Sequence, residues 1–274
     1  MTTTAIIAGQ GALPGLLVAA LQRRGQAFVL AEIEGFPATI PGIAPLRFRL
    51  ERLVPFLEHL ADAGVTRVVF AGAVQRPRLE PELFDARTAT LVPQLLGAIQ
   101  SGDDVALRAV IGIFEEWNFE VVGADTLAPD LVPAAGLLTG TPSGVDRQDV
   151  ARAAVIVAAL GALDLGQGAV VAQGLCLAVE TLPGTDAMLT FVEAHATRLR
   201  PDPKGAKGVL YKAPKPGQDR RIDLPALGPD TVHAAHRAGL AGIAWEAGGV
   251  MLLDRGTMQS LAESFGLFLW ARTP

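Results

Sequence analysis

The sequence predicts an α/β protein of two domains, and three observations lead to that prediction. Short strands rich in valine and isoleucine alternate with helical segments through the first half. In the second half the order of elements changes, because predicted strands follow one another directly. A stretch rich in proline and glycine separates the halves. Strands joined by helices form parallel βαβ units whose sheet is covered on both faces. We expect a Rossmann-like N-terminal domain with a parallel sheet over residues 1–130, a linker over 131–145 and a mixed α/β C-terminal domain over 146–274.

The first half contains four predicted strands, each an apolar run with the length of a buried strand. They cover residues 4–9, 27–33, 66–72 and 119–124. The intervening segments have helical spacing of apolar residues, and a glycine in the C-cap position ends the second of them. These helices are expected at residues 13–25, 50–64, 90–100 and 103–117.

In the second half of the chain, helices and strands are predicted in a mixed order. Helices are expected at residues 145–160, 185–199, 229–238 and 257–265, and strands at 168–173, 174–180, 242–247 and 250–254. The first two strands meet at Gln173 and Gly174, which favours a hairpin around these two residues. Residues 201–219 are rich in proline, glycine, lysine and aspartate, so we expect an extended, exposed loop there.

The composition excludes several classes of protein. Half of the 274 residues are hydrophobic, and the net charge of -5 comes with scattered basic residues. A nucleic-acid partner is therefore not expected, because phosphate-backbone binding needs a concentrated basic face. Cys176 is the single cysteine, which excludes an internal disulfide and fits a reducing compartment. Residues 153–163 form the longest apolar run, shorter than the roughly 20 residues of a spanning helix, so we expect a cytoplasmic protein without a transmembrane segment.

The turn after the first strand, residues 9–15, resembles a dinucleotide-binding turn but breaks its pattern. The fingerprint requires a glycine where this chain has Pro14. The turn can still direct backbone N–H groups at a phosphate, and simple strand-to-helix packing explains it equally. Arg76 follows the third strand, where ligands of open α/β sheets collect, so it is placed either to bind an anion or to pair with a surface carboxylate.

Carboxylates of the second half fall beside glycines and strand ends. They are Asp164, Glu180, Asp186, Asp219, Asp223 and Glu246. Hard cations such as Mg²⁺ take oxygen ligands, often one or two carboxylates together with substrate phosphates. The basic residues of the same region, suited to cradling phosphate, are Lys212, Lys215, Arg220 and Arg221. The pattern indicates metal-assisted phosphoryl transfer, and an ordinary exposed loop would contain the same residues, so both interpretations stay open.

Seven segments in order resemble one known family. They are AGQGALP (8–14), AGAVQRP (71–77), GDD (102–104), LDLGQ (163–167), GTDAML (184–189), KPGQDRRIDLPALG (215–228) and AGLAGIAWEAGG (238–249). With these segments the chain resembles the LpxI family of UDP-2,3-diacylglucosamine pyrophosphatases, which act in lipid A biosynthesis. Gln10 departs from the pattern, because many relatives have another glycine there.

The resemblance implies a hydrolase with a lipid-linked substrate held between two domains. The reaction would be Mg²⁺-dependent cleavage of UDP-2,3-diacylglucosamine to UMP and 2,3-diacylglucosamine 1-phosphate (lipid X), with water attacking the phosphorus nearer the sugar. Mn²⁺ is an alternative metal. The DLP motif of the family matches Asp223-Leu224-Pro225, so Asp223 carries the catalytic role, with Lys215 and Arg221 expected to stabilise charge. The expected metal ligands are Asp223, Asp186 and Asp219.

The expected substrate-binding residues come from both halves of the chain. They are Gly9, Gly11, Leu13, Pro14, Gly72, Arg76, Gln167, Thr185, Gln218 and Glu246. The partners are then the substrate and its lipid product, and the sequence is compatible with peripheral contact at the inner membrane and with a homo-oligomer. Two alternative functions stay open: a non-catalytic sugar-nucleotide sensor and, with the glycine pattern against it, a Rossmann-type oxidoreductase.

Overall fold

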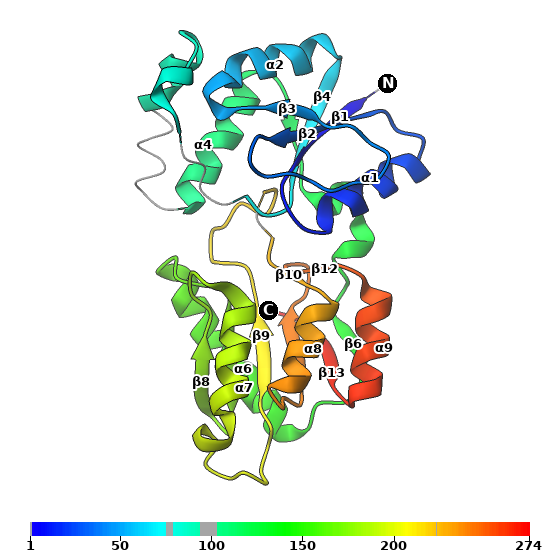
Figure 1. Cartoon of the computed structure of the whole chain (residues 1–274). Coiled ribbons are helices and arrows are strands. Elements are labelled where there is room, and N and C mark those ends of the chain that lie inside the picture. The colour runs from blue at the N-terminus through cyan, green and yellow to red at the C-terminus, as the bar shows by residue number, and fades with distance from the viewer. Residues whose placement is uncertain (1, 75–78, 94–102, 223) are drawn as a thin grey trace. The chain divides into compact units, whose positions relative to one another are not determined.

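The protein folds into two compact units, as its computed structural model shows (Figure 1). The structure describes residues 2–74, 79–93, 103–222 and 224–274. The N-terminal unit comprises Met1–Pro129 together with Asp219–Asp223, and the C-terminal unit comprises Asp130–Gln218 and Leu224–Pro274. The expected α/β fold class with two domains is confirmed. The chain therefore leaves the first unit at Pro129, returns to it for one short segment, and leaves it again.

The N-terminal unit contains a parallel five-stranded sheet in the order β3-β2-β1-β4-β5. The strands are β1 (Thr3–Ala8), β2 (Phe28–Ile33), β3 (Leu46–Phe48), β4 (Val65–Ala71) and β5 (Glu120–Val121). The helices are α1 (Leu13–Arg23), α2 (Leu53–Asp62), α4 (Asp103–Glu116) and α5 (Ala124–Leu127), with 3-10 turns η1 (Leu50–Arg52), η2 (Pro81–Leu83) and η3 (Thr88–Leu91). A further 3-10 turn, η4 (Pro129–Leu131), spans the boundary between the units. Side chains of α2 and α4 share one buried apolar cluster with β1 and β4, and α1 and α5 pack against each other.

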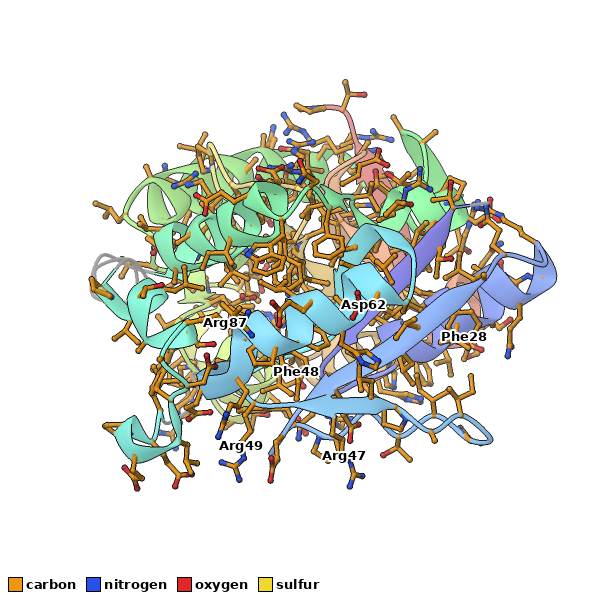
Figure 2. All side chains as sticks on the ribbon, turned by 90° about the horizontal axis from the view of Figure 1, so that it is seen from above. Phe28, Arg47, Phe48, Arg49, Asp62 and Arg87 are labelled. Carbon is orange, nitrogen blue, oxygen red and sulfur yellow. The ribbon has the colours of Figure 1, made fainter. Side chains whose placement is uncertain are left out.

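In the edge strand β3, Phe48 is apolar and buried whereas the residues on either side of it are charged (Figure 2). Phe48 turns inward and stacks on Phe56 of α2 with ring centroids 3.8 Å apart. Its neighbours carry charge, and Arg47 pairs with Glu32 at 2.7 Å while Arg49 pairs with Glu34 at 2.7 Å. The sequence did not predict this strand, because three residues of alternating character are too few to establish a period.

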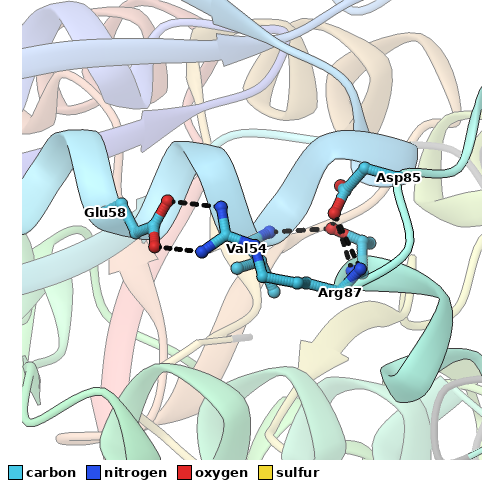
Figure 3. A network of polar contacts seen from close by, with 5 residues as sticks. Val54, Glu58, Asp85 and Arg87 are labelled. Carbon is cyan, nitrogen blue, oxygen red and sulfur yellow. Dashed lines mark hydrogen bonds and ion pairs between the residues drawn. The ribbon is translucent and has the colours of Figure 1, made fainter.

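The first turn of α2 is capped from a distant part of the chain (Figure 3). Its N-cap residue provides no side-chain acceptor. The buried hydroxyl of Thr88 accepts the Val54 N–H at 3.0 Å and donates to Asp85 Oδ2 at 2.6 Å. Arg87 adds a bidentate ion pair with Glu58. An N–H group that the helix leaves without a partner is thus satisfied, and η3 is fixed to α2.

The C-terminal unit contains a mixed six-stranded sheet in the order β6-β13-β11-β9-β7-β8. Its strands are β6 (Gly136–Thr139), β7 (Gly168–Ala172), β8 (Leu175–Val179), β9 (Val209–Lys212), β11 (Gly242–Glu246) and β13 (Phe268–Arg272). A small parallel pair, β10 (Ala226–Leu227) and β12 (Met251–Leu252), stands apart. Helix α6 (Gly144–Ala162) packs on one face of the large sheet, and α7 (Gly184–Leu199), α8 (Pro229–Arg237) and α9 (Arg255–Phe265) pack on the other.

The expected hairpin between β7 and β8 is confirmed. Gln173 and Gly174 take positive φ values of 54° and 79°, and the strands pair antiparallel. The buried carboxylate of Asp149 on α6 accepts the N–H groups of both turn residues, at 2.9 and 2.7 Å. The turn is therefore held by local backbone preference and by one helix side chain.

Several expectations about individual segments need correction. The expected exposed loop at 201–219 was wrong over Val209–Lys212, which form the fully buried strand β9. The strand could not be predicted, because its few apolar residues show no period and are flanked by proline, glycine and lysine. The expected strand at 119–124 shortens to β5, because α5 begins at Ala124. Strand β13 was not predicted, and β6 lies within the segment 131–145 that was expected to be a linker. Most of the helix expected at 90–100 lies outside the described residues.

The loops that follow β1 and β4 pack backbone against backbone. Gly9 donates its N–H to Ala71 O at 2.8 Å, and Gln10 and Ala73 exchange two backbone hydrogen bonds of 2.9 Å. A Cβ atom on Gly9 would lie 2.5 Å from Ala73 O, and one on Gly72 would lie 2.6 Å from Gln10 O. Both positions therefore require glycine for close approach.

Replacing Gly9 with alanine should destabilise the fold by about 1–3 kcal/mol, the usual cost of overpacking. The free energy of unfolding from urea titration measures this. Gly15→Ala is the matched control, because its added methyl meets nothing within 4 Å and alanine favours the helix. Equal stability of the Gly9→Ala variant and the wild type would refute the close-approach argument.

Candidate active site

The parallel sheet of the N-terminal unit gathers several expected site residues at one edge. All its strands end on the same side, and the strand order reverses between β1 and β4, where open α/β sheets bind ligands. Gly9 follows β1 and Gly72 follows β4, and the hydrogen bonds described above join their loops. The structure thus brings Gly9 and Gly72 together, and it gives both a packing role as well.

The start of α1 lies at the same edge. Its N-cap residue, Ala12, provides no side-chain acceptor, and Gly11 before it is exposed with a φ of 99°. The side chains of Leu13 and Pro14 are buried, whereas Gln10, Gly11 and Ala12 before them are exposed. Backbone N–H groups at a helix start favour an anionic ligand. Arg76, expected to act beside them, lies outside the described residues.

The returning segment Asp219–Asp223 joins this unit beside the end of β5. A Cβ atom on Gly123 would lie 3.5 Å from the carbonyl oxygen of Arg220, and Ile222 packs against the apolar cluster under α2 and α4. Asp223, the expected catalytic residue and metal ligand, lies outside the described residues. Ile222, the residue before it in the sequence, is partly buried against that cluster.

Arg221 is held between two carboxylates in this segment. Its guanidinium donates to Asp219 through Nε at 3.0 Å and through Nη2 at 2.7 Å, and to Glu115 of α4 at 2.6 Å. The hydrogen bonds from Arg221 hold the pKa of Asp219 below its usual range. The two carboxylates in turn raise the pKa of Arg221, which is therefore permanently charged. The partner on α4 could not be predicted from residue patterns, because it depends on contact between segments far apart in the chain.

The mixed sheet of the C-terminal unit also gathers polar residues at one edge. Strands β9, β11 and β13 are parallel and β7 runs against β9, so Gln167, before β7, lies beside the end of β9. Gln218 Oε1 accepts the Lys215 N–H at 2.9 Å and the Gln167 Nε2–H at 3.2 Å. Lys215 Nζ pairs with Asp164 at 2.5 Å. The expected residues Gln167, Lys215 and Gln218 thus form one connected group.

A second group at this edge was not predicted as a unit. Lys212 ends β9, Glu180 follows β8 and Thr185 lies in the first turn of α7. Thr185 Oγ1 accepts from Lys212 Nζ at 2.7 Å and donates to Glu180 Oε2 at 2.5 Å. Because Lys212 is buried and bound internally, it does not belong to an exposed phosphate cradle. In the sequence, this group was indicated only by a lysine at the end of a short run of apolar residues.

Glu246 ends β11 at the same edge and is half-buried. A Cβ atom on Gly249 would lie 2.9 Å from Glu246 Oε1, so the following turn closes against this carboxylate. Burial raises the pKa of Tyr211 on β9, a hydrogen bond with Arg272 opposes the rise, and the charge of Glu246 adds to it. These three side chains therefore form a polar group on the α6 face of the sheet.

The described carboxylates do not form a Mg²⁺ site by themselves. Asp186 is exposed in the first turn of α7, and both oxygens of Asp219 accept hydrogen bonds from Arg221. Throughout the described ranges, no three His, Cys, Asp or Glu side chains gather where a metal ion could be held. The proposed ligand Asp219 is thus engaged by a cation, and the metal assignment of Asp186 stays a prediction.

The fold and these two sheet edges define a class of protein: an α/β protein with polar groups at the carboxyl ends of its strands, where such proteins bind ligands. Family models of the LpxI N-terminal domain and the LpxI C-terminal domain match residues 3–131 and 134–270. The UDP-2,3-diacylglucosamine pyrophosphatase LpxI of Caulobacter vibrioides is 37% identical over 276 residues, covering 100% of this chain and 99% of that protein. The chain belongs to the LpxI family, and as a member of it the chain is an enzyme of the hydrolase class, as expected. In the part of the chain that the structure describes, no helix combines the length and the apolar character needed to span a membrane.

Asp219→Asn should lower the free energy of unfolding at pH 7 by about 0.5–1 kcal/mol, a modest value because Arg221 is 41% exposed. The pKa of Asp219 is depressed in the folded state, so its contribution is present above the unfolded pKa of about 3.9 and is lost as pH falls through the lower folded value. Urea titrations at pH 7 and pH 3 should therefore show a deficit that shrinks in acid.

Glu116→Gln, which changes an exposed carboxylate on α4, is the control for this prediction. A deficit of the same size at both pH values would mean that Asp219→Asn acts through packing and not through charge.

Proposed function

We propose that this enzyme hydrolyses the pyrophosphate of UDP-2,3-diacylglucosamine to UMP and 2,3-diacylglucosamine 1-phosphate, a step of lipid A biosynthesis. One observation carries the proposal: 37% identity over the full length of a pyrophosphatase named for that substrate. The positions that motivate the chemistry lie in the segment 215–223.

In this proposal Asp223 orients the attacking water or accepts its proton. Lys215 and Arg221 stabilise the charge that develops on the pyrophosphate, because fixed charges cost no reorganisation during the reaction. Their fixation supports this role: Asp164 and Gln218 bind Lys215, and Asp219 and Glu115 bind Arg221. Gln167 takes part through Gln218, and the backbone turns at Gly11 and Gly72 offer N–H groups to the substrate, while the N–H of Gly9 is bound to Ala71 and holds these turns together.

We also propose that turnover needs a divalent cation, Mg²⁺ or Mn²⁺. Such an ion would offset the negative charge of the two phosphates. Because Mg²⁺ is often bound through one or two carboxylates and substrate phosphates, the requirement rests on Asp223 and on the substrate. In this proposal the protein is cytoplasmic and contacts the inner membrane peripherally, because its substrate carries lipid chains.

Purified protein should release UMP from UDP-2,3-diacylglucosamine in Mg²⁺ and lose this activity in EDTA, with recovery when Mg²⁺ or Mn²⁺ is added back. Release of UMP is measured by chromatography in detergent. Undiminished release in EDTA would contradict the metal requirement alone. Binding of the substrate without release of UMP in Mg²⁺ would contradict the proposed reaction.

Asp223→Ala should lower kcat by about 10²–10⁴-fold, the usual contribution of a positioned acid or base. Asp230→Ala is the matched control, because Asp230 is an exposed aspartate in the first turn of α8. The control should keep the wild-type rate of UMP release. Wild-type turnover by Asp223→Ala would remove Asp223 from the mechanism.

A further inference from the structure

Asp164 lies directly after helix α6, in a backbone conformation that residues with a side chain rarely adopt. Its φ is 55°. The helix ends in a Schellman motif, in which the Leu165 N–H donates to Leu160 O at 3.0 Å and the Asp164 N–H donates to Gly161 O at 3.0 Å. Glycine is the usual residue at the left-handed position of this motif, because a Cβ atom makes that conformation costly. An aspartate at this position therefore costs stability that a glycine would not.

The carboxylate of Asp164 binds the side chain of Lys215. Asp164 Oδ1 accepts from Lys215 Nζ at 2.5 Å. The Asp164 side chain is 41% exposed and the Lys215 side chain is 16% exposed. An ion pair with one partner this exposed stabilises a fold only weakly, because water screens it. Stability therefore does not explain why an aspartate stands at the end of α6.

The main chain of Lys215 is held separately from its side chain. The Lys215 N–H donates to Gln218 Oε1 at 2.9 Å, and the Gln218 N–H donates to Lys215 O at 3.1 Å. This loop lies against the last turn of α6, where a Cβ atom on Gly161 would lie 3.1 Å from Lys215 Cα and 2.7 Å from Pro216 Cδ. These contacts leave the flexible four-carbon side chain of Lys215 free to turn. The ion pair with Asp164 fixes its far end, and all these residues belong to the C-terminal unit.

We infer that Asp164 is a positioning residue for Lys215: its carboxylate, placed by the end of α6, holds the Lys215 ammonium at one point. The inference rests on the proposed function, in which Lys215 stabilises charge on the pyrophosphate. A cation stabilises a transition state best when its position is set before the reaction begins. Asp164 acts through Lys215 and need not touch the substrate. Its loss therefore lowers kcat with little change in KM, because the charge develops only in the transition state.

Two substitutions at one position separate this role from a structural one. Asp164→Asn removes the charge but tolerates the left-handed backbone, and Asp164→Gly also relieves the backbone. In the full-length protein both should lower kcat for UMP release about 10–100-fold, the effect of a reacting group displaced by up to about 1 Å. The melting temperature of Asp164→Gly should equal or exceed that of the wild type, so the loss of activity cannot come from unfolding. A wild-type kcat in either variant would overturn the inference.

The end of helix α4 offers a matched control. Asn118 has a φ of 62°, and the same motif is formed there by the Phe119 N–H with Phe114 O at 3.2 Å and the Asn118 N–H with Glu115 O at 2.9 Å. Asn118→Gly makes the same change of backbone preference at an exposed position. It should keep the wild-type kcat. An equal loss of activity in Asn118→Gly and Asp164→Gly would assign the effect to the helix ends and refute a role through Lys215.

A double-mutant cycle tests whether Asp164 acts through Lys215. Lys215→Met should itself lower kcat, because it removes the cation. Adding Asp164→Asn to Lys215→Met should then change kcat by less than about twofold, since the ion pair is already absent. If Asp164→Asn lowered kcat as much in this background as in the wild type, Asp164 would act by another route and the inference would be wrong.

The mobility of the Lys215 ammonium separates this inference from the proposed function. Nitrogen-15 relaxation of lysine Nζ groups gives their order parameters, and the value for Lys215 should fall in Asp164→Asn. The exposed Lys204 is the internal reference and should not change. If the wild-type protein releases no UMP, the proposed function fails, and the order parameter still decides whether Asp164 holds Lys215. An unchanged order parameter at Lys215 contradicts the inference whatever the activity.

Discussion

Parallel pairing of buried strands is the constraint on which the rest of this structure depends. A strand covered on both faces has no place for polar side chains along its length, so polar residues collect where the strands end. In the N-terminal unit this places the glycine turns after β1 and β4 together at the point where the strand order reverses. In the C-terminal unit it places Lys212, Glu246 and Arg272 at neighbouring strand ends, with Gln167 and Glu180 beside them.

The cations of the proposed site are already bound to carboxylates of the protein. Arg221 lies between Asp219 and Glu115, and Lys215 pairs with Asp164. An anionic ligand therefore meets charges whose geometry is set in advance, and it must compete with these acids or share their cations. The paired acids weaken the attraction of these cations for an anionic ligand but fix their orientation. Fixed cations suit stabilisation of the charge in a transition state better than tight binding of the substrate.

Sequence patterns predicted the elements with a clear period and missed the short ones. The hairpin at Gln173-Gly174 and helices such as α2 were predictable, because local turn preferences and amphipathic spacing are clear there. Strand β9 was missed because four residues, Val-Leu-Tyr-Lys, are too few to show a period. The candidate site showed the same division: residue types indicated phosphate chemistry, whereas the pairing of Arg221 with Glu115 depends on tertiary contact.

The route of the chain between its units has a consequence for how the protein is made. Residues 219–223 belong to the N-terminal unit, and Ile222 packs against its core. A ribosome adds about 5–20 residues each second, so the first unit waits several seconds, without this part of its core, while residues 130–218 are synthesised. The nascent N-terminal unit is incomplete during that interval, and the same stretch of translation that completes its core also delivers the DLP motif.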